Sequence, residues 1–445
     1  MNNTSNASLR IPLAWLVLGI FALLAAGIFS LLLVLSRTPA IQAHIPIIDF
    51  FHVALVIHVN LSVLIWFLSF AAVLWTMNTR PIKVIDYSAL ALAYLGTLGL
   101  VLSPLAGADK PLMNNYVPVI EHPWFYVSLG LFGSGILLVA LKSVLRPVNP
   151  VAFFRNSALN NSVYASAWVT LAALLALLTS YLNLPKTLSS ESYFEFLFWG
   201  GGHVLQFSHT LLALVAWIWL LDISGYKRLR TGRTLTPLLI ITVMPVLSVP
   251  FIYYQYEVLS SDHHVSFTLL MKYGGLTTLP VGCLIVYALF ERSKSSEDTK
   301  HFRASLYASL LLFAAGGIIA FLIQGANVVI PAHYHGSIVG ITLAFMGLTY
   351  YLLPHFGYTK PNIKLAHMQP YIYGGGQLMH ILGLAWSGGY GVQRKTAGAA
   401  QGLDRLPEIA GMGMMGLGGL ISIIGGALFL WIVIKVLLAG KKHQG

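Results

Sequence analysis

Residues 333–353 read HYHGSIVGITLAFMGLTYYLL, a run of 21 residues without one Asp, Glu, Lys or Arg. At a rise of about 1.5 Å per residue, this run forms a helix of roughly 30 Å, the thickness of the hydrocarbon core of a bilayer. Two histidines stand at its beginning, although ionisable groups inside a membrane are costly and usually functional. The stretch therefore predicts a transmembrane helix that carries a functional site.

The rest of the chain has the same character. Of its 445 residues, 57% are apolar and 9% are charged, whereas ordinary soluble domains contain roughly 25% charged residues. Apolar runs recur from Pro12 to the C-terminus, so we predict a single polytopic membrane domain over residues 1–445 without an appended soluble domain. The first run, Ile11–Ser36, is longer than the core of a signal peptide and is predicted to be a retained span.

The polar breaks between the apolar runs predict an all-α membrane protein with twelve transmembrane helices. An even number of spans places both termini on one side of the membrane. With that side in the cytoplasm, 19 of the 26 lysines and arginines lie inside and six lie outside, so both termini are predicted to be cytoplasmic. The predicted spans are 12–36, 48–76, 87–107, 122–145, 161–183, 193–221, 236–256, 266–290, 304–324, 333–353, 369–389 and 411–438.

The same asymmetry accounts for the net charge of +12. Basic loops on the cytoplasmic side interact with anionic lipid head groups, so the charge indicates a lipid bilayer as the partner and not nucleic acid. We expect an integral membrane protein of a bacterial or archaeal cytoplasmic membrane.

Three glycine runs have two interpretations. Residues 411–419 (GMGMMGLGG) open the last span, and we interpret them as small residues that let two helices approach closely. Residues 200–202, directly before His203, and residues 374–376 could instead leave room for a flat cofactor.

Metal chemistry in this chain must use histidine. Cys283 is the only cysteine, which excludes disulfide frameworks, cysteine-rich zinc sites, iron–sulfur clusters and covalent haem attachment through Cys-x-x-Cys-His. A single histidine in a span is often only hydrogen-bonded to a neighbouring helix, but several together indicate a cofactor site. Those at predicted membrane depth are His52, His58, His203, His209, His333, His335 and His380.

The spacing of these histidines constrains what they can ligate. His333 and His335 lie about 200° apart around a helix, so one helix can ligate two separate cofactors. A six-coordinate haem needs a second imidazole from another helix, and a five-coordinate haem needs an open face for a gas. His58 and His203 are the candidates to complete these arrangements. His52 and His58 lie about 240° apart, so both cannot face one haem, and spacing alone does not choose between them.

The segment Ile330–Gly336 (IPAHYHG), followed by Gly347–Pro354 (GLTYYLLP), resembles helix ten of subunit I of the haem–copper oxidase superfamily, which includes cytochrome oxidases and nitric oxide reductases. The resemblance covers most of the chain, and a bundle of twelve helices is the fold that it implies. Residues 116–126 (YVPVIEHPWFY) are most similar to the short, B-type oxidases.

The resemblance implies roles for the histidines. In helix ten of the family the two histidines ligate a high-spin and a low-spin haem, the roles implied for His333 and His335. Residues 55–61 (LVIHVNL) resemble the helix-two segment with the other low-spin ligand, which favours His58 over His52.

Two further motifs complete the implied site. Residues 194–207, which end in FWGGGHVLQF, resemble the helix-six segment whose histidine ligates the active-site copper, the role implied for His203. Residues 384–395 (LAWSGGYGVQRK) resemble the stretch whose basic pair neutralises haem propionates, the role implied for Arg394 and Lys395.

The chain departs from the family at positions that carry its chemistry. Phe207 stands where oxygen-reducing members with this helix-six motif have a tyrosine that supplies an electron and a proton. Leu284 replaces the lysine of one proton channel, and Gln206 stands where some members have a glutamate. Both familiar proton inputs are therefore predicted to be absent. Lys272, within a predicted span, is interpreted as a partner of a propionate or as reaching the membrane surface.

The ligands of the second metal form another departure. The family has a His-His pair about twenty-five residues before the helix-eight proline, where this chain has Tyr254–Glu257 (YQYE). Its adjacent histidines stand only 16 to 17 residues before Pro280. Copper or non-haem iron needs about three imidazoles or a mixed imidazole and carboxylate set. The candidate metal ligands are His203, His263 and His264, and the alternatives are Tyr253, Tyr254 and Glu257.

The resemblance implies a catalytic subunit of a respiratory oxidoreductase that reduces a small gas, with two haems, one low-spin and one high-spin, and copper or non-haem iron. The absence of a tyrosine at position 207 favours NO as the substrate. O2 stays an alternative, because Tyr253 or Tyr254 would supply the tyrosine from another helix. Because the chain has no haem c or dicopper motif, we expect a partner subunit carrying haem c or copper to deliver electrons. The alternatives are a haem subunit for electron transfer or gas sensing without a second metal, and a twelve-span transporter.

Overall fold

The structure is a computed structural model that describes residues 9–36, 50–145, 157–226, 229, 232–290, 296–396 and 402–441. Helices occur at all twelve predicted ranges, which confirms the all-α membrane fold. Among the described residues, eleven helical segments are long and apolar enough to cross a membrane. The remaining one, α15 (Ile363–Gly389), is equally long but contains glycines and glutamines that make it less apolar. The cytoplasmic location of the termini stays a prediction.

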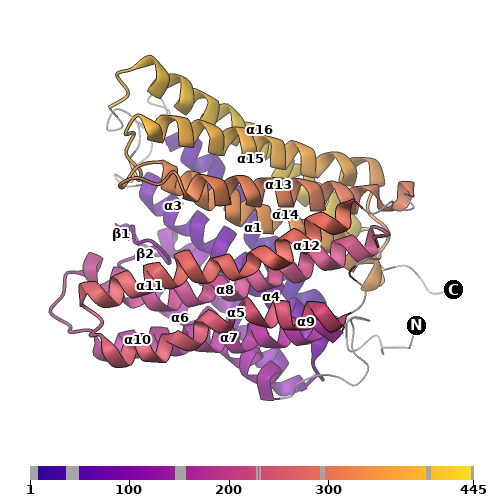
Figure 1. Ribbon diagram of the computed structural model, residues 1–445, viewed down its shortest axis with the longest axis horizontal. Helices are drawn as coiled ribbons and strands as arrows, with labels where there is room; N and C mark the ends of the chain where they lie inside the picture. The colour runs from indigo at the N-terminus through magenta and orange to yellow at the C-terminus, as the bar shows by residue number, and fades with distance from the viewer. Residues whose placement is uncertain are drawn as a thin grey trace. The chain divides into compact units, whose positions relative to one another are not determined.

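The chain divides into two compact units. Unit 1 comprises residues 1–29, 47–215 and 228–291, and unit 2 comprises residues 30–46, 216–227 and 292–445. Figure 1 labels the elements of both units along the chain.

Unit 1 contains the helices of the first eight predicted spans, except for the last residues of the first and sixth. Spans seven and eight are each interrupted by a 3-10 turn beside a proline, Pro245 and Pro280, because proline has no N–H to donate within a helix. Two short antiparallel strands, β1 (Pro111–Leu112) and β2 (Val119–Ile120), pair Pro111 with Ile120. The helices are α1 (Arg10–Ser36), α3 (Phe50–Val59), η1 (Asn60–Ile65), α4 (Trp66–Asn78), α5 (Lys83–Leu102), η2 (Ser103–Ala106), α6 (Pro123–Leu145), α7 (Ser157–Asn183), α8 (Ser190–Ile223), α9 (Gly232–Ile241), η3 (Met244–Ser248), α10 (Val249–Gln255), α11 (Ser261–Gly274), η4 (Gly275–Thr278) and α12 (Leu279–Leu289).

The second span changes its helical pitch in the middle of the membrane. Helices α3 and α4 are continuous through η1, a π-helical turn that starts two residues after His58. The buried Asn60 amide donates to the carbonyl oxygens of Val56, at 2.9 Å, and of Pro118, at 2.7 Å. Asn60 thereby ties this turn to the strand that follows Pro118. Because π-helical turns are frequent at functional sites, the position of this turn supports a functional role for His58.

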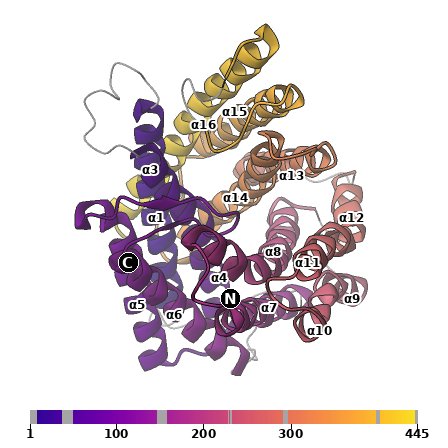
Figure 2. The same cartoon turned by 90° about the vertical axis from the view of Figure 1, so that its left-hand side faces the viewer.

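Helices α5 and α6 lie side by side (Figure 2), with glycines at their contact. A Cβ atom added to Gly135 would lie 2.6 Å from the carbonyl oxygen of Ala89, so a larger residue would force the helices apart. One end of this helix pair is closed by an ion pair, Lys142 Nζ to Asp86 Oδ1 at 2.5 Å, with both side chains 1% exposed. Lys142 thus belongs to the last turn of α6 and is buried.

Replacing Lys142 with Met should destabilise the protein by about 3–5 kcal/mol, because it leaves the Asp86 carboxylate buried without its cation. Thermal unfolding in detergent would measure the loss, and the double variant Lys142→Met/Asp86→Leu should recover most of it. Lys300→Met is the matched control, since Lys300 pairs with an 88% exposed Glu297, and should change stability little. Equal effects of the two lysine variants would contradict the prediction.

Unit 2 is a bundle of four long helices. Its core consists of apolar side chains from all four, among them Leu312, Leu343, Ile381 and Met412. The backbone N–H of Val328, just before α14, donates to the carbonyl oxygen of Val392 at 3.0 Å and ties the loop after α15 to the start of α14. The elements are η5 (Glu297–Thr299), α13 (Lys300–Ala320), α14 (Val329–His355), α15 (Ile363–Gly389) and α16 (Leu406–Leu438).

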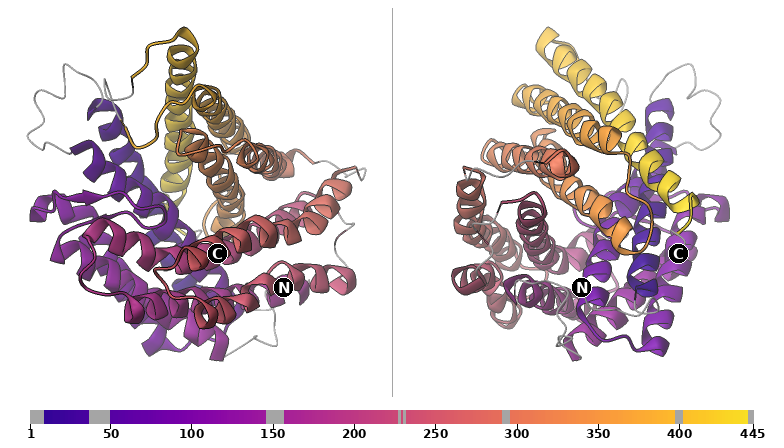
Figure 3. Two further views of the ribbon diagram at one scale, coloured as in Figure 1. Left: turned by 60° about the vertical axis from the view of Figure 1, so that its left-hand side comes forward. Right: turned by 90° about the vertical axis from the view of Figure 1, so that its right-hand side faces the viewer.

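The glycines of α16 bring it close to α15, as Figures 2 and 3 show. A Cβ atom added to Gly425 would lie 2.5 Å from the backbone nitrogen of Tyr373, and one added to Gly411 would lie 3.0 Å from the carbonyl oxygen of Gly383. The interpretation of residues 411–419 as a helix contact is therefore confirmed for Gly411 and Gly418, whereas a Cβ atom on Gly413 or Gly416 would meet no other residue.

Candidate functional site

The two histidines of α14 face different neighbouring helices. His333 bonds through Nδ1 to the carbonyl oxygen of Gly316 on α13, at 2.9 Å. The ring of His335 lies edge-on to the ring of His380 on α15, with 4.8 Å between ring centroids. This arrangement agrees with the angle of about 200° expected for side chains two residues apart.

Four histidines share one hydrogen-bonding pattern, in which Nδ1 lies within 2.9 Å of a backbone carbonyl oxygen. Because a carbonyl can only accept, Nδ1 carries the proton and Nε2 keeps its lone pair. This is the tautomer that binds haem iron or copper through Nε2, with the orientation of the ring held by the second bond. The bonds join His58 to Ala26, His203 to Trp199, His333 to Gly316 and His380 to Met415.

His58 and His52 differ in their surroundings. His58 is bonded to Ala26 of α1, so its ring is held by a second helix, and it lies two residues before the π-helical turn. The ring of His52 lies 5.2 Å from that of its chain neighbour Phe51. The ring that is bonded to α1 belongs to His58, the histidine that the family resemblance favours as a haem ligand.

His203 lies on α8 inside an aromatic cage and is 4% exposed. Its ring centroid is 4.6 Å from Trp199, 4.8 Å from Tyr116 and 5.9 Å from Phe267. Tyr116 comes from the loop between β1 and β2, where the backbone N–H of Asn115 donates to Glu195 on α8 at 3.0 Å. The cage therefore combines residues from α8, α11 and an anchored loop.

The glycines before His203 let side chains and backbone from other elements pack directly against α8. The place of a Cβ atom on Gly200 is taken by the hydroxyl of Tyr253, and that on Gly202 by the ring of Tyr116. A Cβ atom on Gly201 would lie 2.9 Å from the carbonyl oxygen of Ala173 on α7. The space that a side chain would need at these three glycines is therefore taken by two phenol rings and by a neighbouring helix.

His263 and His264 begin α11 in the same neighbourhood as His203. His263 is fully buried, 5.0 Å from the rings of both Tyr253 and Phe267, and neither of its ring nitrogens has a hydrogen-bond partner. His264 stacks on Trp199 with 3.5 Å between ring centroids. In the part of the chain that the structure describes, no three His, Cys, Asp or Glu side chains converge closely enough to hold a metal ion.

The donor set nevertheless has the chemistry that a metal requires. A buried imidazole without a partner on either nitrogen is costly, and coordination through one nitrogen would remove that cost at His263. His203 has Nδ1 bonded to Trp199, so its Nε2 is free of that bond. Each of these two histidines offers one nitrogen of the kind that ligates copper or iron, while His264 is stacked on Trp199.

The structure separates the two tyrosines of α10. The Tyr253 hydroxyl donates to the carbonyl oxygen of Ala176 at 2.9 Å and lies 2.8 Å from the Ser180 hydroxyl, both on α7. Tyr254 is 89% exposed and points away from the protein interior. Glu257 is also exposed. Of the alternative ligands, only Tyr253 lies beside His263.

The basic pair lies in the loop that follows α15. The neighbouring residue Gln393 pairs with Asn327, which lies two residues before α14, and Lys395 has a left-handed backbone with φ of 62°. Arg394 and Lys395 therefore follow a residue that is paired with the segment just before α14, at the end of that helix that carries His333. This position suits cations that meet the propionates of a haem bound at that histidine.

Two residues of the site carried no expected role. His380 is the ring neighbour of His335, and Tyr116 is a ring neighbour of His203. His380 stood out only as a histidine within a span, and nothing in its spacing relates it to α14. Tyr116 lies in a loop, where no periodicity predicts which side chains turn inward.

An apolar cavity of about 110 Å³ lies in unit 1 beside the residues that precede His203. Its lining includes Gly201 and Gly202, and Thr170 is its only hydroxyl residue. A cavity of this size with an apolar lining can hold a small apolar molecule such as a diatomic gas.

Comparisons with known proteins identify relatives of this chain. The family model described as Cytochrome C and Quinol oxidase polypeptide I matches residues 10–428. An uncharacterized protein of Rickettsia prowazekii (strain Madrid E) is 33% identical over 97% of both chains. An uncharacterized protein of Aquifex aeolicus (strain VF5) is 28% identical over 80% of this chain and 88% of its own.

A solved structure shares the fold. The structure of a heme-copper terminal oxidase dimer, determined by cryo-EM, matches with a TM-score of 0.74. The match covers 99% of this chain and 86% of that chain at 19% sequence identity.

Proposed function

The chain belongs to the cytochrome c and quinol oxidase polypeptide I family, the subunit I family of haem–copper terminal oxidases, and on that premise we propose that it is a di-haem subunit that reduces a small gas, with NO preferred over O2. The observation that carries the proposal is the set of histidines whose Nδ1 is bonded to a backbone carbonyl, so that Nε2 can ligate. Family membership also argues against a transporter.

The residues that would hold the cofactors follow from this set. His58 and His335 would ligate the low-spin haem, His333 the high-spin haem, and His203 with His263 the second metal. When bound, these groups supply electron storage and a site where the gas binds. The chain contributes rings of fixed tautomer and orientation, because each Nδ1 bond to a carbonyl holds its imidazole in place.

The side chains around His203 favour NO. Joining two NO molecules into N2O and water consumes two electrons and two protons, whereas rapid cleavage of O2 in the family also uses an electron and a proton from a tyrosine. Phe207, 3% exposed and packed against Gly274, can supply neither. Tyr253 is the phenol that could replace it, but its hydroxyl is already engaged by Ala176 and Ser180.

We expect the purified complex to reduce NO faster than O2 per haem, with little or no proton pumping. Consumption of each gas at matched electron supply, measured with gas electrodes, tests this expectation, and Phe207→Tyr should raise the O2 rate relative to the NO rate. Rapid O2 reduction without NO activity would contradict the proposal, and loss of that O2 activity in Tyr253→Phe would then identify Tyr253 as the replacement phenol.

Electrons must come from a partner. The sequence lacks haem c and dicopper motifs, so we propose an electron-donating subunit that carries haem c or copper in a bacterial or archaeal cytoplasmic membrane. Co-purification of a redox-active subunit from native membranes would test this assignment.

Neutralising the basic pair in Arg394→Gln/Lys395→Gln should lower the haem reduction potentials. Cations beside the propionates disfavour the extra positive charge of the oxidised haem, so their loss stabilises the oxidised state. Spectroelectrochemical titration measures the potentials, and Arg405→Gln, a change of a 72% exposed side chain, serves as the control. Unchanged potentials would mean that the pair does not contact a propionate.

One observation favours a second candidate function. Within the described residues no group of three metal-ligating side chains is assembled, which suits a haem subunit for electron transfer or gas sensing without a second metal. Metal analysis of the purified protein separates the two, because the enzyme requires copper or non-haem iron in addition to the two haem irons.

A further inference from the structure

His380, in the second half of α15, contacts two other helices of unit 2. Its Nδ1 lies 2.9 Å from the carbonyl oxygen of Met415 on α16. On its other side, the ring lies edge-on to the ring of His335 on α14, with 4.8 Å between the ring centroids and 61° between the ring planes. One imidazole thus connects three helices.

Two glycines of α16 let α15 come close enough for the bond to Met415. A Cβ atom added to Gly418 would clash with the backbone nitrogen of His380, and one added to Gly419 would lie 3.4 Å from the Nδ1 of His380. The Met415 carbonyl lies one helical turn before Gly419. The position of the His380 ring is therefore determined by backbone groups of α16.

The bond to Met415 also determines the tautomer of His380. Because a carbonyl oxygen can only accept, Nδ1 of His380 carries the hydrogen and Nε2 is an acceptor. An imidazole that ligates iron through Nε2 carries its own hydrogen on Nδ1, so His335 in its proposed role has an N–H to donate. A ring separation of 4.8 Å allows a nitrogen of one ring to reach hydrogen-bond distance from a nitrogen of the other.

The two histidines lie among residues of the apolar core of unit 2. Ala332 and Val339, which precede and follow His335 by about one turn, belong to that core. So does Leu384, one turn after His380. Because residues three or four apart on a helix are neighbours, the pair borders apolar side chains. A hydrogen bond in such surroundings is stronger than the same bond in water.

We propose that His380 is a positioning residue for His335, in which Nε2 of His380 accepts a hydrogen bond from Nδ1–H of His335. The proposal rests on the proposed function, in which His335 ligates the low-spin haem. A hydrogen bond donated by a ligating imidazole fixes the orientation of its ring and raises its basicity. A more basic ligand stabilises the oxidised haem, so His380 lowers the reduction potential of the low-spin haem.

The two histidines of α14 then differ in the group that holds them. His333 is bonded to the Gly316 carbonyl, a backbone group that no side-chain substitution removes. The partner proposed for His335 is a side chain. Substitution of His380 therefore changes the surroundings of one haem ligand and leaves the bond of the other in place.

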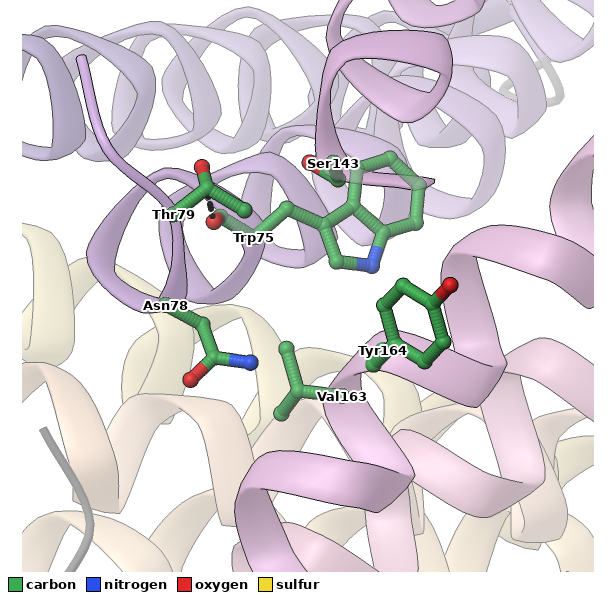
Figure 4. Close-up of a pocket in the computed structure, with 6 residues that line it drawn as sticks. All are labelled: Trp75, Asn78, Thr79, Ser143, Val163 and Tyr164. Atoms are coloured by element: carbon green, nitrogen blue, oxygen red, sulfur yellow. Dashed lines mark hydrogen bonds between the residues drawn. The ribbon is translucent and has the colours of Figure 1, made fainter. Parts of the chain in front are cut away.

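The test compares deletion of the imidazole with its replacement by an amide. His380→Leu removes both the N–H and the acceptor, whereas His380→Gln retains one acceptor oxygen and N–H donors. Asn78→Leu in unit 1 is the matched control. Asn78 is 3% exposed, and its amide donates to the carbonyl oxygen of Asn160 at 3.1 Å, so it joins α4 to α7 as His380 joins α15 to α16. Figure 4 shows Asn78 in a pocket with Trp75 and Val163.

Spectroelectrochemical titration of the purified complex measures the potential of each haem, and thermal unfolding measures stability. We expect His380→Leu to increase the ratio of reduced to oxidised low-spin haem at the wild-type midpoint roughly tenfold, which is about 59 mV for one electron. His380→Gln should remain close to the wild-type potential. Asn78→Leu should lower the unfolding temperature without a change in either potential. The increase has the opposite sign to the effect expected for Arg394→Gln/Lys395→Gln.

An unchanged low-spin potential in His380→Leu would overturn the role of His380, as would a shift of the same size in Asn78→Leu. Complete loss of the reduced α-band would instead make His380 a haem ligand and would also overturn the positioning role. If His380→Leu does not assemble, His380→Phe, which keeps a planar ring without nitrogen atoms, replaces it in the same comparison. A wild-type protein that lacks the sharp α-band would overturn the proposed function together with this inference, whereas an unchanged potential with the band present overturns the inference alone.

Discussion

His58→Ala should abolish the sharp α-band of the reduced protein while the haem at His333 stays bound. The expected loss is complete, because a six-coordinate haem becomes high-spin or dissociates when one of its two imidazoles is removed. His58 is held by the Ala26 carbonyl at 2.9 Å and precedes the π-helical turn of the second span. Reduced-minus-oxidised spectra and a pyridine haemochrome assay measure both quantities.

The neighbouring histidine provides the control for this experiment. His52→Ala should keep the α-band and both haems, because His52 faces about 240° away from His58 on the same helix. The haem at His333 should persist in both variants. A lost α-band in His52→Ala together with an intact one in His58→Ala would reverse the ligand assignment.

His203→Ala should abolish gas reduction and remove the second metal while both haems stay bound. The reason is that His203 offers Nε2 from inside a closed aromatic cage, where no water-exposed side chain can take its place. Metal analysis and NO consumption by the same preparation measure the two effects. His263→Ala should also lower the metal content, and more than His264→Ala does, since His264 is stacked on Trp199.

The control for His203 lies on the same helix. His209→Ala removes a histidine six residues later, whose ring packs 4.9 Å from Phe67, and should leave the metal content and the gas reduction rate in place. Full metal content in His203→Ala would exclude His203 as a ligand. Normal gas reduction without any second metal in the wild type would favour the alternative of a subunit without that metal.

The fold was predictable because the bilayer dictates it. Every apolar run long enough to cross the membrane forms helices, and the observed ends lie within a few residues of the predicted ones, as for 333–353 against Val329–His355. Most helices begin earlier than predicted because they continue into the polar region beyond the hydrocarbon core, where Lys300 starts α13. The division into two units leaves no trace in the hydropathy.

The sequence also determined the directions in which side chains of one helix point relative to one another. His333 and His335 point to different helices because a helix turns about 100° per residue, whatever surrounds it. The same geometry distinguishes His52 from His58. Family motifs then assigned roles that geometry alone left open.

Only the tertiary structure decided which residues from different elements meet. Tyr253 and Tyr254 are adjacent in the sequence, yet one lies against Gly200 and the other is 89% exposed. The contact of His380 with His335 depends on how α15 packs on α14. Hydropathy and periodicity describe one helix at a time, whereas these contacts depend on the rotation and depth of two helices at once, which side-chain packing and buried hydrogen bonds determine.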